Sequence, residues 1–231
     1  MFFVREKGKI RTKIWVKYPE MMRGNEKKSA LTALILAGGK SSRVGANQNK
    51  AHLRLNGRPL IDIVIEKVNQ VVDNQIIIVG PPEEYPSYRQ VVSDLFSQRG
   101  PLGGIFSGLK ASPSFYNLVV GCDMPFLKVD LLRYMVQNID KYDVIIPYYG
   151  EGLIEPLCAI YSKRCLKVME KNLDHKLFSI RRIFPFLKVR YMVEKEIRKY
   201  DPELYSFFNI NYPEDLKRAE GILKEEKIEN N

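Results

Sequence analysis

A stretch rich in glycine and serine, with an arginine after it, offers the first chemistry in this sequence. Residues 36–45 read Leu-Ala-Gly-Gly-Lys-Ser-Ser-Arg-Val-Gly, and the first two of them end an apolar run, Leu31–Ala37. The glycines allow the backbone to approach a phosphate closely, while the two serines and Arg43 supply hydrogen-bond donors. The stretch therefore predicts a loop that binds the phosphates of a nucleotide.

Two common nucleotide motifs do not fit this stretch. A P-loop would need glycine where Leu34 stands, and the spacing G-x-G-x-x-G cannot be placed here. The sequence thus disfavours both a P-loop NTPase and a dinucleotide-binding dehydrogenase.

Asp123 is the second group that could do chemistry. It follows the apolar residues 118–120 and precedes Pro125. A carboxylate that leaves a buried strand is costly to bury unless a cation pairs with it. Mg²⁺ suits this position, because it takes few protein carboxylates and completes its shell with water and phosphate oxygens. Capping of the next helix is the alternative role for Asp123.

Lys50 and Asp94 are further candidates. A loop lysine such as Lys50 can place a compact positive charge on a phosphate, although solvated lysines are common. Asp94 lies just before the glycine-rich segment 100–104 and can accept hydrogen bonds from a nucleobase or a ribose. Position alone does not separate these roles from structural ones.

The elements that must position these residues alternate along the chain. Apolar runs predict strands, and apolar residues at three- and four-residue spacing predict helices between them. We expect strands at 31–37, 75–79, 91–92, 117–122, 144–147, 156–161, 187–193 and 207–210, and helices at 59–72, 102–109, 127–139, 162–172, 178–184 and 213–224. This order predicts an α/β fold, a Rossmann-like, doubly wound, mostly parallel sheet with helices on both faces. Ligands of such folds bind beyond the carboxyl ends of the strands, where the candidate residues fall.

Length and charge limit the domain organisation. The 231 residues predict one domain at 31–226, with a basic N-terminal extension at 1–30 and a polar tail at 227–231. The extension carries nine Lys and Arg against three Asp and Glu, which is +6 of the formal net charge of +10. Because the remaining chain is only mildly basic, we expect no nucleic-acid partner.

The apolar runs and the cysteines indicate which kinds of partner, metal site and compartment suit the protein. No apolar run reaches the length of a membrane span, so we expect no membrane partner. Three cysteines without a C-x-x-C pair, together with only two histidines, argue against structural zinc and for a reducing cytoplasm.

Several segments together resemble one family. Leu36–Arg43, Lys50, Asn56–Leu60, Gly100–Ile105, Cys122–Leu127, Glu155–Leu157 and Asn209–Leu216 occur in the order seen in nucleotidyltransferases. More narrowly, the chain resembles the molybdenum cofactor guanylyltransferase (MobA) family over about residues 31–222. Three features depart from that pattern: Asn49 stands where an acidic residue is usual, Val44 replaces the usual Met, and the segment before Lys50 is slightly longer.

The resemblance implies the nucleotidyltransferase fold and transfer of GMP from GTP to the terminal phosphate of molybdopterin, with release of pyrophosphate. It implies that Leu36, Ala37, Gly38 and Gly39 hold the nucleotide, that Asp94 contacts GTP, and that Asp123 binds Mg²⁺. It also implies that Lys50 contacts the phosphates. We expect Lys50 and Arg43 to stabilise the charge that develops there, which makes Lys50, Arg43 and Asp123 the expected catalytic residues. Molybdoenzymes and other cofactor-biosynthesis proteins are the implied protein partners.

Two alternatives remain open at this point. A related enzyme could use CTP, or could activate another phosphorylated small molecule such as a sugar phosphate. From a different class, the chain could be a nucleotide-binding regulatory protein without turnover. The altered Asn49–Lys50 segment keeps that second alternative open, whereas the presence of both Lys50 and Asp123 counts against it.

Overall fold

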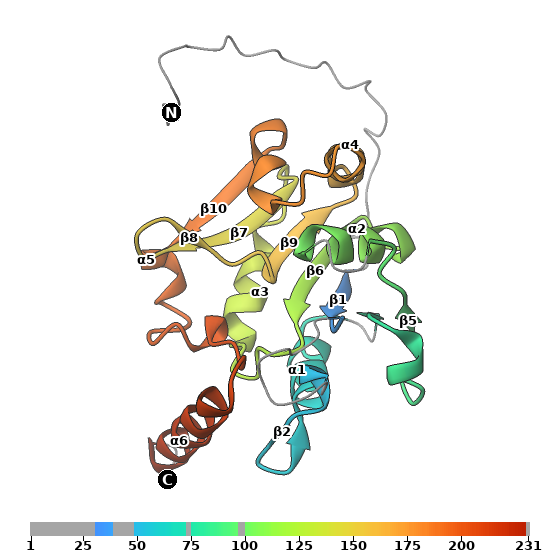
Figure 1. The fold of residues 1–231 in the computed structure, drawn as a ribbon. Helices are drawn as coiled ribbons and strands as arrows, with labels where there is room; N and C mark the ends of the chain where they lie inside the picture. Colours follow the sequence, from blue (N-terminus) through green and yellow to red (C-terminus); the bar gives the residue numbers. More distant parts are fainter. Residues whose placement is uncertain (1–30, 39–48, 73–74, 97–99, 230–231) are drawn as a thin grey trace.

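A central sheet organises the protein. The computed structural model describes residues 31–38, 49–72, 75–96 and 100–229, and eight strands in these ranges pair in the order β10-β7-β9-β6-β1-β4-β5, with β8 on β7 (Figure 1). The sheet strands are β1 (Thr32–Leu36), β4 (Ile76–Val79), β5 (Val91–Val92), β6 (Tyr116–Gly121), β7 (Val144–Tyr149), β8 (Leu153–Ile154), β9 (Cys158–Ser162) and β10 (Val189–Val193). A separate hairpin joins β2 (Arg54–Leu55) to β3 (Arg58–Pro59).

The direction of β9 distinguishes this sheet from a fully parallel one. β1 pairs in parallel with β4 and β6, β4 with β5, and β7 with β10, which confirms the predicted mostly parallel sheet. β9 runs antiparallel to β6 and β7, and β8 antiparallel to β7. Because Val120 near the end of β6 pairs with Cys158 at the start of β9, the residues before β9 lie at the edge where β6 ends.

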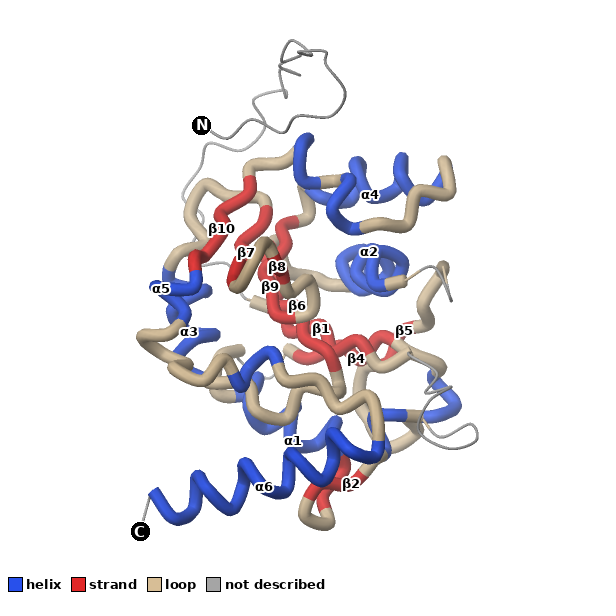
Figure 2. The backbone as a smooth tube through the Cα atoms, turned by 60° about the vertical axis from the view of Figure 1, so that its left-hand side comes forward, coloured by secondary structure: helices blue, strands red, loops and turns tan. Residues whose placement is uncertain are grey.

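Helices cover both faces of the sheet, as predicted (Figure 2). α2 and α4 share one hydrophobic cluster with the sheet, and α1, α3 and α5 share the other. The helices are α1 (Leu60–Asn69), α2 (Pro101–Ala111), α3 (Val129–Gln137), α4 (Cys165–Asp174), α5 (Glu194–Ile197) and α6 (Pro213–Glu229). In the described ranges, no helix is both long and apolar enough to span a membrane.

The largely apolar sequence of β1 follows from this layered arrangement. Ala33, Leu34 and Ile35 are all fully buried. Leu34 packs in the cluster with α2 and α4, while Ala33 and Ile35 pack in the cluster with α1 and α3. A strand covered on both faces needs apolar residues at nearly every position, which is why β1 lacks the polar alternation of a half-exposed strand. Its polar residue, Thr32, is buried with its hydroxyl hydrogen-bonded to that of Ser114 at 2.7 Å.

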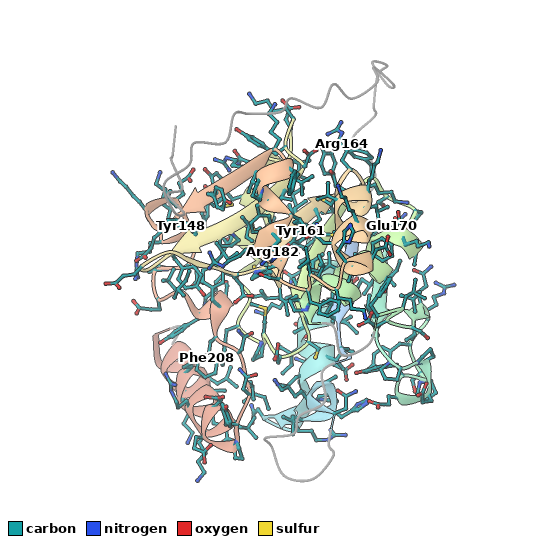
Figure 3. The ribbon with its side chains drawn as sticks, turned by 45° about the horizontal axis from the view of Figure 1, so that its top comes forward. Tyr148, Tyr161, Arg164, Glu170, Arg182 and Phe208 are labelled. Carbon is teal, nitrogen blue, oxygen red and sulfur yellow. The ribbon has the colours of Figure 1, made fainter. Side chains whose placement is uncertain are left out.

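A third cluster ties the C-terminal helix to the hairpin. Asn56 and Gly57 have positive φ values of 51° and 81°, which fit the two-residue turn between β2 and β3. Leu55 of the hairpin packs in one cluster with Phe126, which follows β6, and with buried residues of α6 and of the segment before it. Phe208, labelled beside α6 in Figure 3, lies with its ring centroid 5.8 Å from that of Phe126. The loop after β6 is therefore anchored to the end of the chain.

Two predicted elements were wrong. The predicted helix at 178–184 is a pair of 3₁₀ turns, Ile180–Arg182 and Phe184–Phe186, because Pro185 disfavours a helical residue before it and cannot donate within a helix. The predicted strand at 207–210 is a 3₁₀ turn, Tyr205–Phe207, followed by a segment without strand pairing. Its apolar residues serve the contact with the β6 loop, where Ile210 N donates to the Asp123 carbonyl over 3.0 Å.

Gly103 tests the close packing at the start of α2. A Cβ there would lie 2.8 Å from Phe96 Cβ and 2.9 Å from the Phe96 carbonyl oxygen, whereas a Cβ at Gly221 of α6 would meet nothing within 4 Å. We expect Gly103→Ala to lower the free energy of unfolding by about 1–3 kcal/mol. Gly221→Ala, the matched control, should leave it unchanged or raise it by up to about 1 kcal/mol. Urea titrations of both variants measure this, and equal midpoints would contradict the packing argument.

Candidate active site

The polar groups of the site gather where β1, β4 and β6 end. Ala37 and Gly38 follow β1, Gly80 follows β4, and Cys122 and Asp123 follow β6. The three loops are in contact: Ala37 N donates to the Val79 carbonyl at 2.9 Å, and Cys122 N donates to the Leu36 carbonyl at 3.1 Å. The parallel pairing of these strands brings residues far apart in sequence to one edge of the sheet.

Lys50 lies at this edge beside Asp123. It belongs to the 3₁₀ turn Lys50–His52, called the Lys50 turn below, which Asn49 caps by accepting a hydrogen bond from Ala51 N at 3.0 Å. Lys50 Nζ lies 3.4 Å from Asp123 Oδ2 and also donates to Asn211 Oδ1. The Lys50 and Asp123 side chains are only 18% and 16% exposed, so the pair is largely withdrawn from water.

The local backbone explains the position of Asp123. A Cβ on Gly121 would lie 2.7 Å from Asp123 Oδ1, so the carboxylate folds back over this glycine, and a larger residue there would displace it. α3 begins at Val129 with Lys128 as its N-cap, and Asp123 therefore does not cap that helix. Burial raises the pKa of Asp123, and the Lys50 charge offsets part of that rise.

Glu155 is a second carboxylate at the site. Its Oε1 accepts from Leu157 N at 3.1 Å, and the Asn209 side-chain amide donates to the same carboxylate. Burial raises the pKa of Glu155 most, and the nearby Asp123 charge adds to the rise. Sequence reasoning noted the segment Glu155–Leu157 but assigned the carboxylate no role. The sequence pattern that could have identified Glu155 is the same as for Asp123: an acidic residue next to a buried apolar strand.

Asp94 lies on the other side of the β1 end, against α2. Its Oδ1 accepts from Phe96 N at 2.9 Å and from Ser107 Oγ at 3.2 Å. A Cβ on Gly104 would lie 3.1 Å from a Leu36 methyl carbon and 3.8 Å from Asp94 Oδ2, so Leu36 and Asp94 both face the start of α2. The structure thus brings Lys50, Asp123 and Asn211 together and sets Asp94 apart from them, beside Leu36.

Two predicted site residues fall outside the described residues. Gly39 and Arg43 belong to the range 39–48, for which the structure gives no placement. Leu36, Ala37 and Gly38 lead directly into that range, and Ala37 is fully buried.

Two surface cavities lie away from these groups. One, of about 310 Å³, is lined by Asn56 and by Glu220, Leu223 and Lys224 of α6. The other, of about 220 Å³, lies between the β2–β3 hairpin, α1 and the loop at Pro125. Neither is lined by Lys50, Asp123 or Asp94.

Comparison with known proteins gives one consistent family. The family described as "MobA-like NTP transferase domain" matches residues 33–190. A molybdenum cofactor guanylyltransferase of Desulfosudis oleivorans is 42% identical over 201 residues, covering 86% of this chain and 98% of that protein. A probable molybdenum cofactor guanylyltransferase of Natranaerobius thermophilus is 38% identical over 201 residues, covering 84% of this chain and 96% of that protein.

Solved structures agree on the fold. The crystal structure of molybdopterin-guanine dinucleotide biosynthesis protein A from Archaeoglobus fulgidus superimposes with a TM-score of 0.72 at 31% identity, covering 84% of this chain and 99% of that chain. The 2-C-methyl-D-erythritol 4-phosphate cytidylyltransferase of Thermus thermophilus superimposes with a TM-score of 0.61 at 17% identity, covering 84% of this chain and 99% of that chain. The second likeness shows the nucleotidyltransferase fold alone.

The cysteines test whether a thiol nucleophile is available at the site. Cys122, next to Asp123, and Cys158 and Cys165 are all buried and unpaired. Burial raises the pKa of each thiol, to about 12 for Cys165, so at pH 8 almost none is thiolate. We expect a maleimide to leave the native protein unmodified at pH 8 and to label all three cysteines after unfolding in urea, as read by intact mass. Rapid labelling of Cys122 in the native protein would contradict this.

Proposed function

The chain belongs to the MobA-like NTP transferase family, and on that basis we propose that it transfers GMP from GTP to the terminal phosphate of molybdopterin, forming the guanine dinucleotide cofactor and pyrophosphate. The identity to a molybdenum cofactor guanylyltransferase and the superposition on an archaeal protein of molybdopterin-guanine dinucleotide biosynthesis support the substrates GTP and molybdopterin. The observation that carries the proposal is the Lys50–Asp123 pair at the carboxyl end of β6, beside the end of β1.

Most residue roles in this proposal are supported by positions in the structure, whereas Gly39 and Arg43, which lie outside the described residues, are assigned from the sequence. Leu36, Ala37, Gly38 and Gly39 bind the nucleotide, and Asp94, beside Leu36, accepts hydrogen bonds from it. Asp94 suits this task because Phe96 N and Ser107 hold its Oδ1, while its Oδ2 accepts no hydrogen bond from the described residues. Lys50 stabilises negative charge on the phosphates, and Arg43 joins it in that role.

The residues present fit a divalent cation. Asp123 and Glu155 place two carboxylates within electrostatic reach of each other, and Lys50 is the cation paired with Asp123. Asn211, whose Oδ1 accepts from Lys50, adds an amide oxygen next to them. A set of oxygen donors with an excess of negative charge suits Mg²⁺, with Asp123 as its protein ligand. When bound, the ion would neutralise phosphate charge during transfer.

The reaction itself needs positioning and charge neutralisation more than covalent help. An oxygen of the molybdopterin phosphate attacks the α-phosphorus of GTP in line. A new P–O bond forms there while the bond from the α-phosphorus to the bridging oxygen breaks, and pyrophosphate leaves with that electron pair. Lys50 holds a positive charge at the phosphates throughout, so no covalent enzyme intermediate is required.

A reducing compartment such as the cytoplasm suits this chain, because its three cysteines are unpaired. The alternative of a regulatory protein without turnover finds little support, since the altered Asn49–Lys50 segment still places Lys50 beside Asp123.

The nucleotide preference is directly testable. We expect GTP with Mg²⁺ to raise the melting temperature more than ATP, CTP or UTP at equal concentration, because a ligand stabilises the native state according to its affinity. Pyrophosphate release with molybdopterin supplied should follow the same order. Equal stabilisation and turnover with CTP would reject the guanylyl assignment and leave the fold unaffected.

Asp123→Asn tests the metal ligand. The amide keeps the shape of the side chain, and Asn211 still accepts from Lys50, so the protein should stay folded. Loss of the negative charge should lower turnover by about a hundredfold or more, as the loss of several kcal/mol of transition-state stabilisation implies. Lys50→Ala should behave similarly.

Asp130→Asn on α3 is the matched control, since that carboxylate is 72% exposed and pairs with Arg133 on the same helix. It should keep the wild-type rate of pyrophosphate release. If Asp123→Asn released pyrophosphate at the wild-type rate across a Mg²⁺ titration, Asp123 would not be the metal ligand.

A further inference from the structure

We propose that Tyr85 is a positioning residue of the nucleotide site, whose hydroxyl joins the segment after β1 to the Lys50 turn. This inference rests on the proposed function, because it assigns a task to those two segments. It concerns a side chain that neither the sequence motifs nor the comparisons single out.

Tyr85 reaches the site from a neighbouring loop. It follows the 3₁₀ turn Pro82–Glu84 and is only 1% exposed. Its hydroxyl donates to the Ala37 carbonyl at 2.6 Å, in the segment proposed to bind the nucleotide. Its ring stacks on His52 of the Lys50 turn at a centroid distance of 5.3 Å. Burial raises the pKa of Tyr85 well above its usual value, so the phenol keeps its proton.

The sequence after β4 makes room for this ring. A Cβ on Gly80 would lie 2.9 Å from Tyr85 Cε2 and 3.3 Å from the Ala37 carbonyl carbon. A larger residue at position 80 would therefore push the ring away from Ala37. Gly80 N donates to the Val92 carbonyl at 3.0 Å, which fixes the backbone against which the Tyr85 ring packs.

Asn49 completes the connection. Its side-chain amide donates to the Tyr85 hydroxyl oxygen at 2.5 Å and to the Glu84 carboxylate, while its Oδ1 caps the Lys50 turn. A tyrosine has one hydroxyl proton, and Tyr85 gives it to Ala37. The chain of hydrogen bonds thus runs in one direction, from Asn49 through Tyr85 to Ala37, and it requires a donor at position 49.

This direction predicts what an acidic residue at position 49 would do. The carboxylate of Asn49→Asp could still cap Ala51 N, but it could not donate to Tyr85. It would instead compete with Ala37 for the Tyr85 proton and would face the Glu84 carboxylate. Asn49→Asp should therefore separate the cap, which is retained, from the connection through Tyr85, which is lost.

Tyr85→Phe is the central experiment, with Tyr88→Phe as its matched control. Tyr88 lies in the same loop, and its hydroxyl donates to Asp62 at 2.7 Å, so each variant loses a hydrogen bond that a tyrosine hydroxyl donates. We expect Tyr85→Phe to raise the Kd of GTP, measured by calorimetry, by about tenfold and to lower kcat/KM in parallel, the size of one lost hydrogen bond. Tyr88→Phe should lose thermal stability with an unchanged Kd and kcat/KM.

Asn49→Asp gives a second, independent readout. We expect it to raise the Kd of GTP as Tyr85→Phe does, and Glu84→Gln in the same chain should recover part of the affinity, because the new amide donates to the carboxylate at position 49. An unchanged Kd in Tyr85→Phe and in Asn49→Asp, with only the melting temperature lowered, would overturn the positioning role.

The failure of this inference differs from the failure of the proposed function. If the wild-type protein preferred another nucleotide, the guanylyl assignment would fail, and the same comparison of Tyr85→Phe with Tyr88→Phe would be read from the Kd of that nucleotide. A selective loss in Tyr85→Phe would then still support the positioning role, and equal behaviour of the two variants would reject it.

Discussion

Asp123 leaves the end of a buried strand with its side chain only 16% exposed, so its negative charge needs a partner close at hand. The rest of the site is arranged around that need. Lys50 comes from the turn after the glycine-rich stretch, and Asn211, just before α6, accepts a second hydrogen bond from the lysine. Because a buried pair that loses one partner leaves an uncompensated charge, each of these segments constrains the others.

The reversal of β9 decides which other groups meet Asp123. In a purely parallel sheet, the residue before β9 would lie at the opposite edge from the residue after β6. Since β9 runs antiparallel to β6, Glu155 lies near Asp123 and raises the negative charge of the site. The return of the chain adds Asn209, which donates to Glu155, and Ile210, whose N–H donates to the Asp123 carbonyl. The same reversal that departs from parallel pairing therefore builds the proposed metal site.

The nucleotide side of the site depends on hydrogen-bond direction rather than on charge. Tyr85 has one proton to give, and Ala37 receives it, so position 49 must supply a donor. An asparagine there satisfies Tyr85 and Glu84 with its amide nitrogen and caps the Lys50 turn with its oxygen. Asn49 departs from the family pattern in the sequence, but it is consistent with Tyr85 and Glu84, which the fold places next to it.

The sequence by itself determined the features that depend on local pattern. The apolar run of β1 and the periodic apolar face of α1 predicted a strand and a helix correctly, because burial against the neighbouring layers determines which positions must be apolar. It did not determine the direction of β9, the unpaired state of residues 207–210, or the roles of Glu155 and Tyr85. These features depend on contacts with residues distant in the chain. An apolar segment such as 207–210 can pair as a strand or pack against the loop after β6, and only the tertiary structure decides between the two.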